Sequence, residues 1–233
     1  MSTFETTLLA REEVAERTMA FHFAKPAGFD FTPGQAIEVA LNGDLRHAFS
    51  IVTAPFEPRL TIATRMRDSA FKRALGSLPV GAHVTMDGPF GSLALPADRS
   101  VPAVLIAGGI GITPFVSMLR QAAHERSPRP LTLIYSNRRP EDAPFLDELR
   151  RLEQQCANFK LVATMTQAGT SRLPWTGETG PIDEALLKKA VGDLGRPIFY
   201  VVGPPAMVEA VQGTLRFAGV EPGRIVTEEF YGY

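Results

Sequence analysis

A glycine-rich stretch near the middle of the chain has the residue types that could hold a phosphate. Gly108, Gly109 and Gly111 follow the apolar run VPAVLIA and precede Thr113 and Pro114. A helix N-terminus presents unpaired backbone amides with a partial positive charge, and glycines let an anion approach them. The third glycine of the dinucleotide fingerprint G-x-G-x-x-G is missing, however. From the spacing alone, two alternatives stay open: a dinucleotide-binding turn of another type, or a tight bend between a strand and a helix.

A second turn of this kind is Gly203-Pro204-Pro205, which ends the apolar run PIFYVV and precedes a helical pattern. In an open sheet of parallel strands, the carboxyl ends of the strands line a common crevice. Two glycine-bearing turns at that edge would form a platform for a flat, phosphate-bearing ligand. Taken alone, the stretch also fits an ordinary turn.

The stretch LRHAFS supplies a third candidate site, because Arg46 and His47 could meet a phosphate and Phe49 could cover a ring. Ser50 could form a hydrogen bond with a ring nitrogen. The alternative is an ordinary strand whose Phe49 is a core residue. A helix that begins near Ser69 would supply a second anion-binding N-terminus. Two anion sites in separate halves of the chain indicate two phosphate-bearing cofactors.

The composition limits the classes of protein that fit. Of the 233 residues, 45% are hydrophobic and 21% are charged, as in soluble globular proteins. The net charge of -1, without a basic block, excludes a general nucleic-acid binder. No apolar run reaches the ~20 residues of a membrane span, and the start of the chain lacks a secretory signal pattern. Cys156 is the only cysteine, so we expect neither an internal disulfide nor a four-thiolate iron–sulfur cluster. The four histidines lack metal-ligand spacing, so we expect no metal, and we expect a cytoplasmic protein.

Short extended runs separated by Gly and Pro turns fill the first part of the chain. QAIEVAL, RLTIATRM and HVTMDGP have strand-like alternation and predict an antiparallel β-barrel over residues 1–97. Near the start, REEVAER contains good helix formers, but the alternating runs on either side favour a hairpin. DSAFKRALGSL has helical spacing, with Asp68 or Ser69 as the N-cap.

Strands and helices alternate in the second part of the chain. Five buried apolar runs, VPAVLIA, LTLIYS, FKLVATM, PIFYVVG and RIVTEEF, are interleaved with four helical patterns. This alternation implies right-handed crossovers. It predicts an α/β domain over residues 98–233 with a five-stranded parallel, doubly wound sheet.

Six motifs occur in one order along nearly the whole chain: HAFS, GPFGSLAL, GGIGITP, YSNRRPEDAPFLDEL, GPPAM and EEFYGY. In this order they resemble the ferredoxin–NADP(+) reductase superfamily of flavoproteins, without an iron–sulfur domain. The resemblance implies a flavin-binding barrel followed by an NAD(P)-binding α/β domain. It implies FAD rather than FMN, and NADPH or NADH as the electron donor. GGIGITP is similar to the superfamily's nicotinamide-nucleotide loop.

The resemblance also implies roles for individual residues. Phe49 would lie along the flavin, and Ser50 would donate a hydrogen bond toward its N5. Glu228 would aid proton exchange, with closure of a surface hydrogen bond as the alternative. The implied flavin contacts are His47, Ala48, Phe49, Ser50, Arg65, Asp68, Ser69, Ala70, Phe71, Lys72, Phe230 and Tyr233. The implied nucleotide contacts are Gly109, Gly111, Ile112, Thr113, Pro114, Ser136, Arg138, Gly203, Pro204, Pro205 and Met207.

Two internal positions depart from the superfamily's pattern. Its arginine aligns with His47, and Arg46, one position earlier, would point to the opposite face of a strand. A neutral histidine would bind a pyrophosphate more weakly than a guanidinium. Val202 stands where many relatives have a cysteine, which excludes a mechanism that needs this thiol.

The end of the chain departs as well, because residues follow the expected terminal aromatic. Phe230, Tyr231 and Tyr233 are therefore alternatives for the aromatic cover of the flavin.

The function implied by the resemblance is transfer of a hydride from NAD(P)H to FAD, and of electrons onward to a ferredoxin, flavodoxin or oxygenase component. The alternatives are a reductase of free flavin or another small molecule, and a non-catalytic electron-relay or nucleotide-binding subunit. The choice between NADH and NADPH stays open. Gln167 is not the acid that favours a free 2′-hydroxyl, whereas Ser171 and Arg172 could meet a 2′-phosphate. The alternative for Arg172 is an ordinary solvated charge of the loop.

Overall fold

The structure is a computed structural model that describes residues 2–41 and 45–231. Its contacts divide the chain into two compact units. The first comprises Met1–Ala94 and Thr113–Gln121, and the second comprises Leu95–Ile112 and Ala122–Tyr233. In the described part of the chain, no helix is both long and apolar enough to cross a membrane.

The first unit is built on a six-stranded antiparallel sheet. Its strands are β1 (Ser2–Ala15), β2 (Thr18–Ala24), β3 (Ala36–Leu41), β4 (Leu45–Ser50), β5 (Arg59–Arg65) and β6 (His83–Phe90). Their order is β4-β3-β6-β1-β2-β5, and the edge strands β4 and β5 contact each other, so the sheet curls into a barrel. The predicted antiparallel barrel is confirmed.

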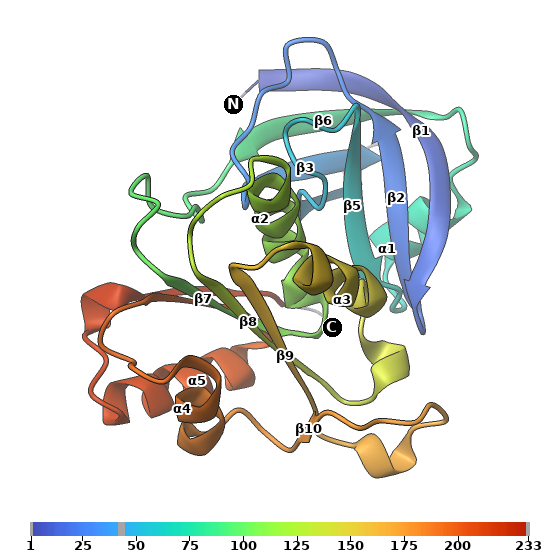
Figure 1. Ribbon diagram of the computed structural model, residues 1–233. Helices are drawn as coiled ribbons and strands as arrows, with labels where there is room; N and C mark the ends of the chain where they lie inside the picture. The colour runs from blue at the N-terminus through green and yellow to red at the C-terminus, as the bar shows by residue number, and fades with distance from the viewer. Residues whose placement is uncertain (1, 42–44, 232–233) are drawn as a thin grey trace. The chain divides into compact units, whose positions relative to one another are not determined.

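The long strand β1 pairs first with one strand and then with another, and Figure 1 shows its curvature. Residues 2–7 pair with β6 and residues 8–15 pair with β2. A register shift between Leu8 and Ala10 marks the change of partner, as expected where a bulge bends a strand. The β1–β2 connection is the hairpin that the alternation favoured, and Arg17 occupies its turn with φ +58°.

Two helical segments complete the first unit. Helix α1 (Ala70–Ser77) begins at Ser69, whose Oγ accepts a hydrogen bond from the Lys72 amide at 3.2 Å. Of the two predicted caps, Ser69 is therefore the one used. The Thr113–Gln121 segment of helix α2 (Thr113–His124) also belongs to this unit, where the Ser117 hydroxyl donates to the Thr53 carbonyl at 2.7 Å.

The second unit contains a sheet of six parallel strands. They are β7 (Ala103–Gly108), β8 (Leu131–Asn137), β9 (Phe159–Met165), β10 (Glu178–Thr179), β11 (Ile198–Gly203) and β12 (Ile225–Glu229). The order is β10-β9-β8-β7-β11-β12, and β7, β8 and β9 lie side by side (Figure 1). The predicted parallel sheet is confirmed, with one strand more than the five expected. The extra strand, β10, is only two residues long, which is too short to show a periodic pattern.

The helices of the second unit are α3 (Leu146–Gln155), α4 (Glu184–Val191) and α5 (Pro205–Phe217). Residues of α4 and α5 pack in one core cluster with Val104, Ile134 and Val201 of the sheet. On β8 the next side chain, Tyr135, points to the opposite face, where its hydroxyl meets the segment that precedes α3. Helices therefore cover both faces, as a doubly wound sheet requires.

Candidate functional site

The two glycine-bearing turns of the second unit pack directly against each other. The short 3₁₀ turn Gly109–Ile112 connects β7 to α2 and lies over the end of β11. A Cβ on Gly111 would lie 2.4 Å from the Val202 carbonyl oxygen, and a Cβ on Gly203 would lie 3.1 Å from the Gly108 nitrogen. Glycine is required at position 111, where the added atom would overlap the backbone, and a side chain at position 203 would fit only if its neighbours shifted. The turns after strands β7 and β11 thus form one continuous edge, as the sequence predicted.

Gly109 is the point of this edge that is open to a ligand. Its φ is +55°, a left-handed conformation that favours glycine, and no atom would lie within 4 Å of an added Cβ. Its carbonyl is held in place by the buried Tyr135 hydroxyl, whose single proton is shared between Gly109 O and Pro144 O, each at 3.1 Å. Burial raises the pKa of Tyr135, so this hydroxyl stays a neutral donor. Sequence reasoning missed Tyr135; its signal was a hydroxyl-bearing side chain inside an otherwise apolar strand.

The remaining predicted nucleotide contacts differ in their position and in how exposed they are. Ser136 lies opposite Gly108 in the β7–β8 register, and the Arg138 side chain is exposed just beyond β8. Met207 packs on Gly108 and Gly203, since its sulfur would lie 2.4 Å from a Cβ on Gly108. Met207 therefore supports the turns from within. Ile112, at the end of the 3₁₀ turn, and Thr113 and Pro114, at the start of α2, are buried.

The loop after β9 is tied to the loop after β8. The Ser171 hydroxyl donates to Glu141 at 2.7 Å and the Arg172 amide donates to the same carboxylate at 3.0 Å. These two hydrogen bonds lower the pKa of Glu141 to about 2. Ser171, which could have met a 2′-phosphate, is thus already engaged with a negative charge.

In the first unit, strand β4 presents a cluster of three rings. His47 stacks on Phe49 with 4.8 Å between ring centroids and 23° between planes. Phe71 of α1 lies 5.6 Å from Phe49 and 5.5 Å from His47. Phe49 and Phe71 are 7% and 6% exposed and belong to the barrel core, whereas His47 is exposed. Ser50 is buried at the end of the same strand, and Ala48 is exposed.

The outer face of the barrel holds Arg46. Its guanidinium pairs with Asp87 at 2.5 Å and with Glu38 at 3.1 Å, on the face opposite His47. Hydrogen bonds from Thr3 and then Arg46 lower the pKa of Asp87. The prediction that Arg46 does not replace His47 agrees with this position.

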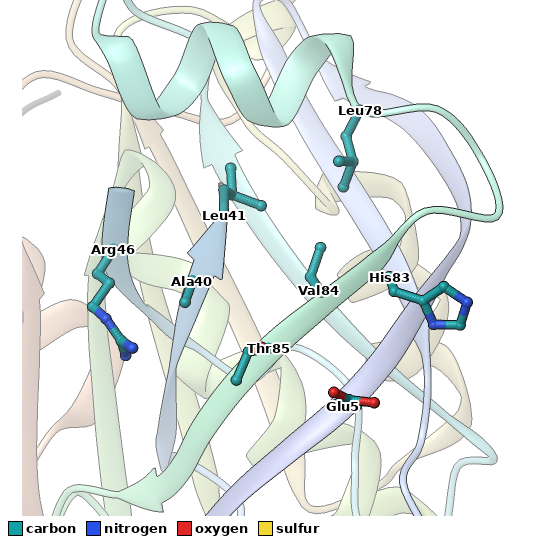
Figure 2. Close-up of a pocket in the computed structure, with 8 residues that line it drawn as sticks. All are labelled: Glu5, Ala40, Leu41, Arg46, Leu78, His83, Val84 and Thr85. Carbon is teal, nitrogen blue, oxygen red and sulfur yellow. The ribbon is translucent and has the colours of Figure 1, made fainter. Parts of the chain in front are cut away.

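A pocket of about 300 Å³ lies beside Arg46 on this outer face, and Figure 2 shows its lining. Its residues are Glu5, Ala40, Leu41, Arg46, Leu78, His83, Val84 and Thr85. None of them is among the flavin and nucleotide contacts that the family resemblance implies. The Arg46 charge at its rim is already balanced by two carboxylates, so the pocket presents mixed polarity.

The N-terminus of α1 lies beside the ring cluster and carries the predicted phosphate contacts. Ser69 and Ala70 are exposed, and Asp68 forms an ion pair with Arg73. Lys72 is 6% exposed, and burial, followed by the nearby Arg67, lowers its pKa. Arg65 ends strand β5 on the approach to this helix and is partly buried.

The C-terminal strand runs beside the second glycine turn. Glu228 lies opposite Val202 in the β11–β12 register, and burial raises the pKa of its carboxyl. The Phe230 amide donates to the Gly203 carbonyl at 3.0 Å. Tyr231 is exposed and its hydroxyl bonds to Glu229. Tyr233 lies outside the described residues.

Comparison with known proteins supports this description. Residues 105–213 match the oxidoreductase NAD-binding domain family. Over 192 residues the chain is 29% identical to the reductase component of propane 2-monooxygenase from Mycolicibacterium smegmatis, covering 80% of this chain and 55% of that protein. It is 28% identical to ferredoxin–NADP reductase B from Sorangium cellulosum, covering 91% of each chain. The chain spans 55–61% of the propane 2-monooxygenase reductase components that it matches.

A solved structure extends the comparison to the whole fold. The ferredoxin NADP+ reductase of Neisseria gonorrhoeae, with bound FAD and NADP, superimposes with a TM-score of 0.84 at 22% identity. The superposition covers 98% of this chain and 99% of that one. Residues 105–213 match an oxidoreductase NAD-binding domain, and the motif order and the fold of the chain are similar to those of ferredoxin–NADP(+) reductases.

Proposed function

We propose that this chain is a flavoenzyme that takes a hydride from NADH or NADPH onto FAD and passes the electrons to a redox protein. The observation that carries the proposal is the continuous edge formed by the turns after β7 and β11, within the region that matches an NAD-binding domain. Relatives whose names are reductase or electron transfer components support a protein acceptor, such as a ferredoxin, a flavodoxin or an oxygenase component.

The residues of the first unit fit FAD. An exposed imidazole and two aromatic rings gather on one face of β4, and the exposed N-terminus of α1 lies next to them with cationic side chains nearby. We propose that His47, Phe49 and Ser50 bind the flavin, and that the α1 N-terminus with Arg65 and Lys72 meets its phosphates. When bound, FAD supplies the conversion of a two-electron hydride into single electrons.

The chain's own side chains would bind and orient the reactants. We propose that the Ser50 hydroxyl orients the flavin ring and that the Glu228 carboxyl holds a proton near the nucleotide edge, in keeping with its raised pKa. Val202 is a buried aliphatic side chain where many relatives have a thiol, so the proposed mechanism uses no thiol at this position.

The proposal also covers which part of the chain binds each cofactor and where in the cell the protein is found. We assign flavin binding to residues 1–97 and nucleotide binding to residues 98–233, although the contacts group Thr113–Gln121 with the barrel. A single cysteine is in keeping with a cytoplasmic protein.

Absorbance spectroscopy tests the proposed function. Purified protein, reconstituted with FAD if necessary, should show flavin bands near ~370 and ~450 nm that bleach on addition of NADH or NADPH without oxygen. Protein that takes up no FAD would refute the proposal and favour a nucleotide-binding subunit. Bleached protein that reduces free FMN but no ferredoxin or flavodoxin would favour the small-molecule reductase.

A further inference from the structure

Helix α2 continues directly from the first glycine turn, yet its first residues are grouped with the barrel. The 3₁₀ turn Gly109–Ile112 belongs to the second unit. Thr113, the next residue, begins both α2 and the segment that is grouped with the first unit. The chain therefore passes from one unit to the other at this point without a linker. Contacts that hold this segment of α2 on the barrel also hold the end of the turn.

A buried hydrogen bond joins this segment to the barrel. The Ser117 hydroxyl donates to the Thr53 carbonyl oxygen at 2.7 Å, and the two residues are 0% and 1% exposed. Thr53 is itself tied to β5, because its Oγ1 accepts a hydrogen bond from the Thr61 amide at 3.1 Å. Water does not reach these groups, so loss of the Ser117 hydroxyl would leave the Thr53 carbonyl buried without this donor.

Two further contacts lie close to this hydrogen bond along α2. Met118 packs against Gly34, since its methyl carbon would lie 2.4 Å from a Cβ added there. Arg120 forms a mostly buried ion pair with Glu57 at 3.3 Å, and the Ala54 amide donates a hydrogen bond to the same carboxylate. The segment is thus attached to the barrel by three side chains within one turn of helix.

We propose that Ser117 is a positioning residue for hydride transfer, which ties the nucleotide turn to the flavin-binding barrel through α2. This inference rests on the proposed function. In that reaction a C–H bond of the reduced nicotinamide breaks, and the hydride passes with both electrons to the flavin, which leaves the oxidised dinucleotide. Displacement of the reacting atoms by about 1 Å lowers the rate of such a step steeply.

The helix between Ser117 and the turn is short and stiff. Ser117 lies about one helical turn, roughly 6 Å along the axis, from Thr113. Movement of α2 at this attachment is therefore passed on to the turn. The Ser117 hydroxyl is engaged with Thr53, so it acts through the helix and not on a cofactor.

The experiment separates the rate of hydride transfer from the binding of each cofactor. Bleaching of the flavin is followed by stopped-flow absorbance without oxygen at saturating NADH or NADPH, and the Kd values for FAD and for the oxidised dinucleotide are measured by titration. We expect Ser117→Ala to lower the saturating rate roughly tenfold and to change either Kd by less than about twofold. The affinities are kept because the turn retains its own supports in the second unit, Tyr135 and Val202.

Thr6→Val is the matched control. The buried Thr6 hydroxyl donates to the Ala24 carbonyl within the barrel, so this variant loses a comparable hydrogen bond away from α2. Its saturating rate should equal that of the wild type. Hydrogen exchange of the cofactor-free proteins gives a second readout: the amides of residues 109–118 should exchange faster in Ser117→Ala than in wild type, and at the wild-type rate in Thr6→Val.

A second variant tests the same attachment without touching Ser117. Arg120→Gln removes the ion pair with Glu57 and should also lower the saturating rate while both Kd values are kept. Circular dichroism confirms the fold of each variant, and Arg120→Gln decides the matter if Ser117→Ala does not fold.

Three results would overturn the inference. They are bleaching of Ser117→Ala, or of Arg120→Gln in its place, at the wild-type saturating rate, a loss of rate in Thr6→Val as large as that in Ser117→Ala, and unchanged hydrogen exchange of residues 109–118. Wild-type protein that binds FAD but is bleached by neither dinucleotide would instead refute the proposed function, so the two failures are distinguishable.

Discussion

Gly111 packs against the backbone of Val202 so closely that a Cβ would come within 2.4 Å of the Val202 carbonyl oxygen. We therefore expect Gly111→Ala to force the turn away from β11 and to lower the free energy of unfolding by about 1–3 kcal/mol. Because the same turn carries the proposed nucleotide edge, the Kd for NAD+ and NADP+ should rise as well. Urea unfolding and nucleotide titration measure the two effects.

Gly213 provides the matched control for this substitution. It lies inside α5, and no atom lies within 4 Å of a Cβ added there. Gly213→Ala should raise the free energy of unfolding by about 0.5–1 kcal/mol, because alanine favours a helix. A loss at Gly213 equal to that at Gly111 would show that close packing is not the cause.

The Tyr135 hydroxyl supports the open turn from beneath. Tyr135→Phe leaves the carbonyls of Gly109 and Pro144 without this donor, so we expect a loss of about 1–3 kcal/mol in the free energy of unfolding. Nucleotide affinity should fall because the turn is less well held. Tyr231→Phe removes an exposed hydroxyl and should change neither quantity. An unchanged nucleotide Kd in Tyr135→Phe would argue against a supporting role.

Burial of Glu228 makes stability depend on pH. Since burial raises the pKa of this carboxyl, its charged form is disfavoured in the folded protein. The loss of folding stability that comes from charging the buried carboxyl is absent below the ordinary pKa of a glutamate. It grows as the pH rises and is complete above the raised pKa of Glu228. Glu228→Gln should therefore have a higher Tm than wild type in mild alkali, and the difference should vanish in acid.

Thermal unfolding of both proteins over a pH series checks this expectation. Glu221→Gln, which changes an exposed carboxylate of the same unit, controls for the loss of one charge. A Tm difference for Glu228→Gln that is the same at every pH would contradict the burial argument.

We expect Glu141 to influence the choice between NADP+ and NAD+. Its carboxylate, with a pKa of about 2, is charged at neutral pH. It accepts hydrogen bonds from the Ser171 hydroxyl and the Arg172 amide, so neither donor is free for another anion. Glu141→Ala removes the negative charge and frees both donors for a 2′-phosphate. We expect the affinity for NADP+ to rise relative to NAD+ by roughly fivefold.

Calorimetric titration of both nucleotides gives this ratio. Asp147→Asn removes an exposed charge from the start of α3 and should leave the ratio unchanged. If both variants shift the ratio alike, a general charge effect rather than the Glu141 site is responsible.

The parts of the fold with a clear period could be predicted from the sequence. The five longer strands and the helices of the second unit, the hairpin of β1 and β2 and the capped helix α1 follow from apolar runs, side-chain periodicity and turn residues. The opposite faces of Arg46 and His47 follow from the twofold repeat of a strand.

Other features depend on contacts between residues that are distant in sequence. The two residues of β10 form a strand only because Glu178 and Thr179 pair with β9. The hydrogen bond from Ser171 to Glu141 joins two loops 30 positions apart, and no local pattern marks it. The grouping of Thr113–Gln121 with the barrel likewise arises from tertiary packing such as the Ser117 contact with Thr53.

The pairing of Ser2 with Gly88 has a practical consequence for work with this protein. Deleting residues 2–7 would leave β6 without its partner on one side and turn an interior strand into an open edge, a template for intermolecular sheet growth. Shortened versions should therefore aggregate during expression, and an affinity tag at this end needs a flexible spacer.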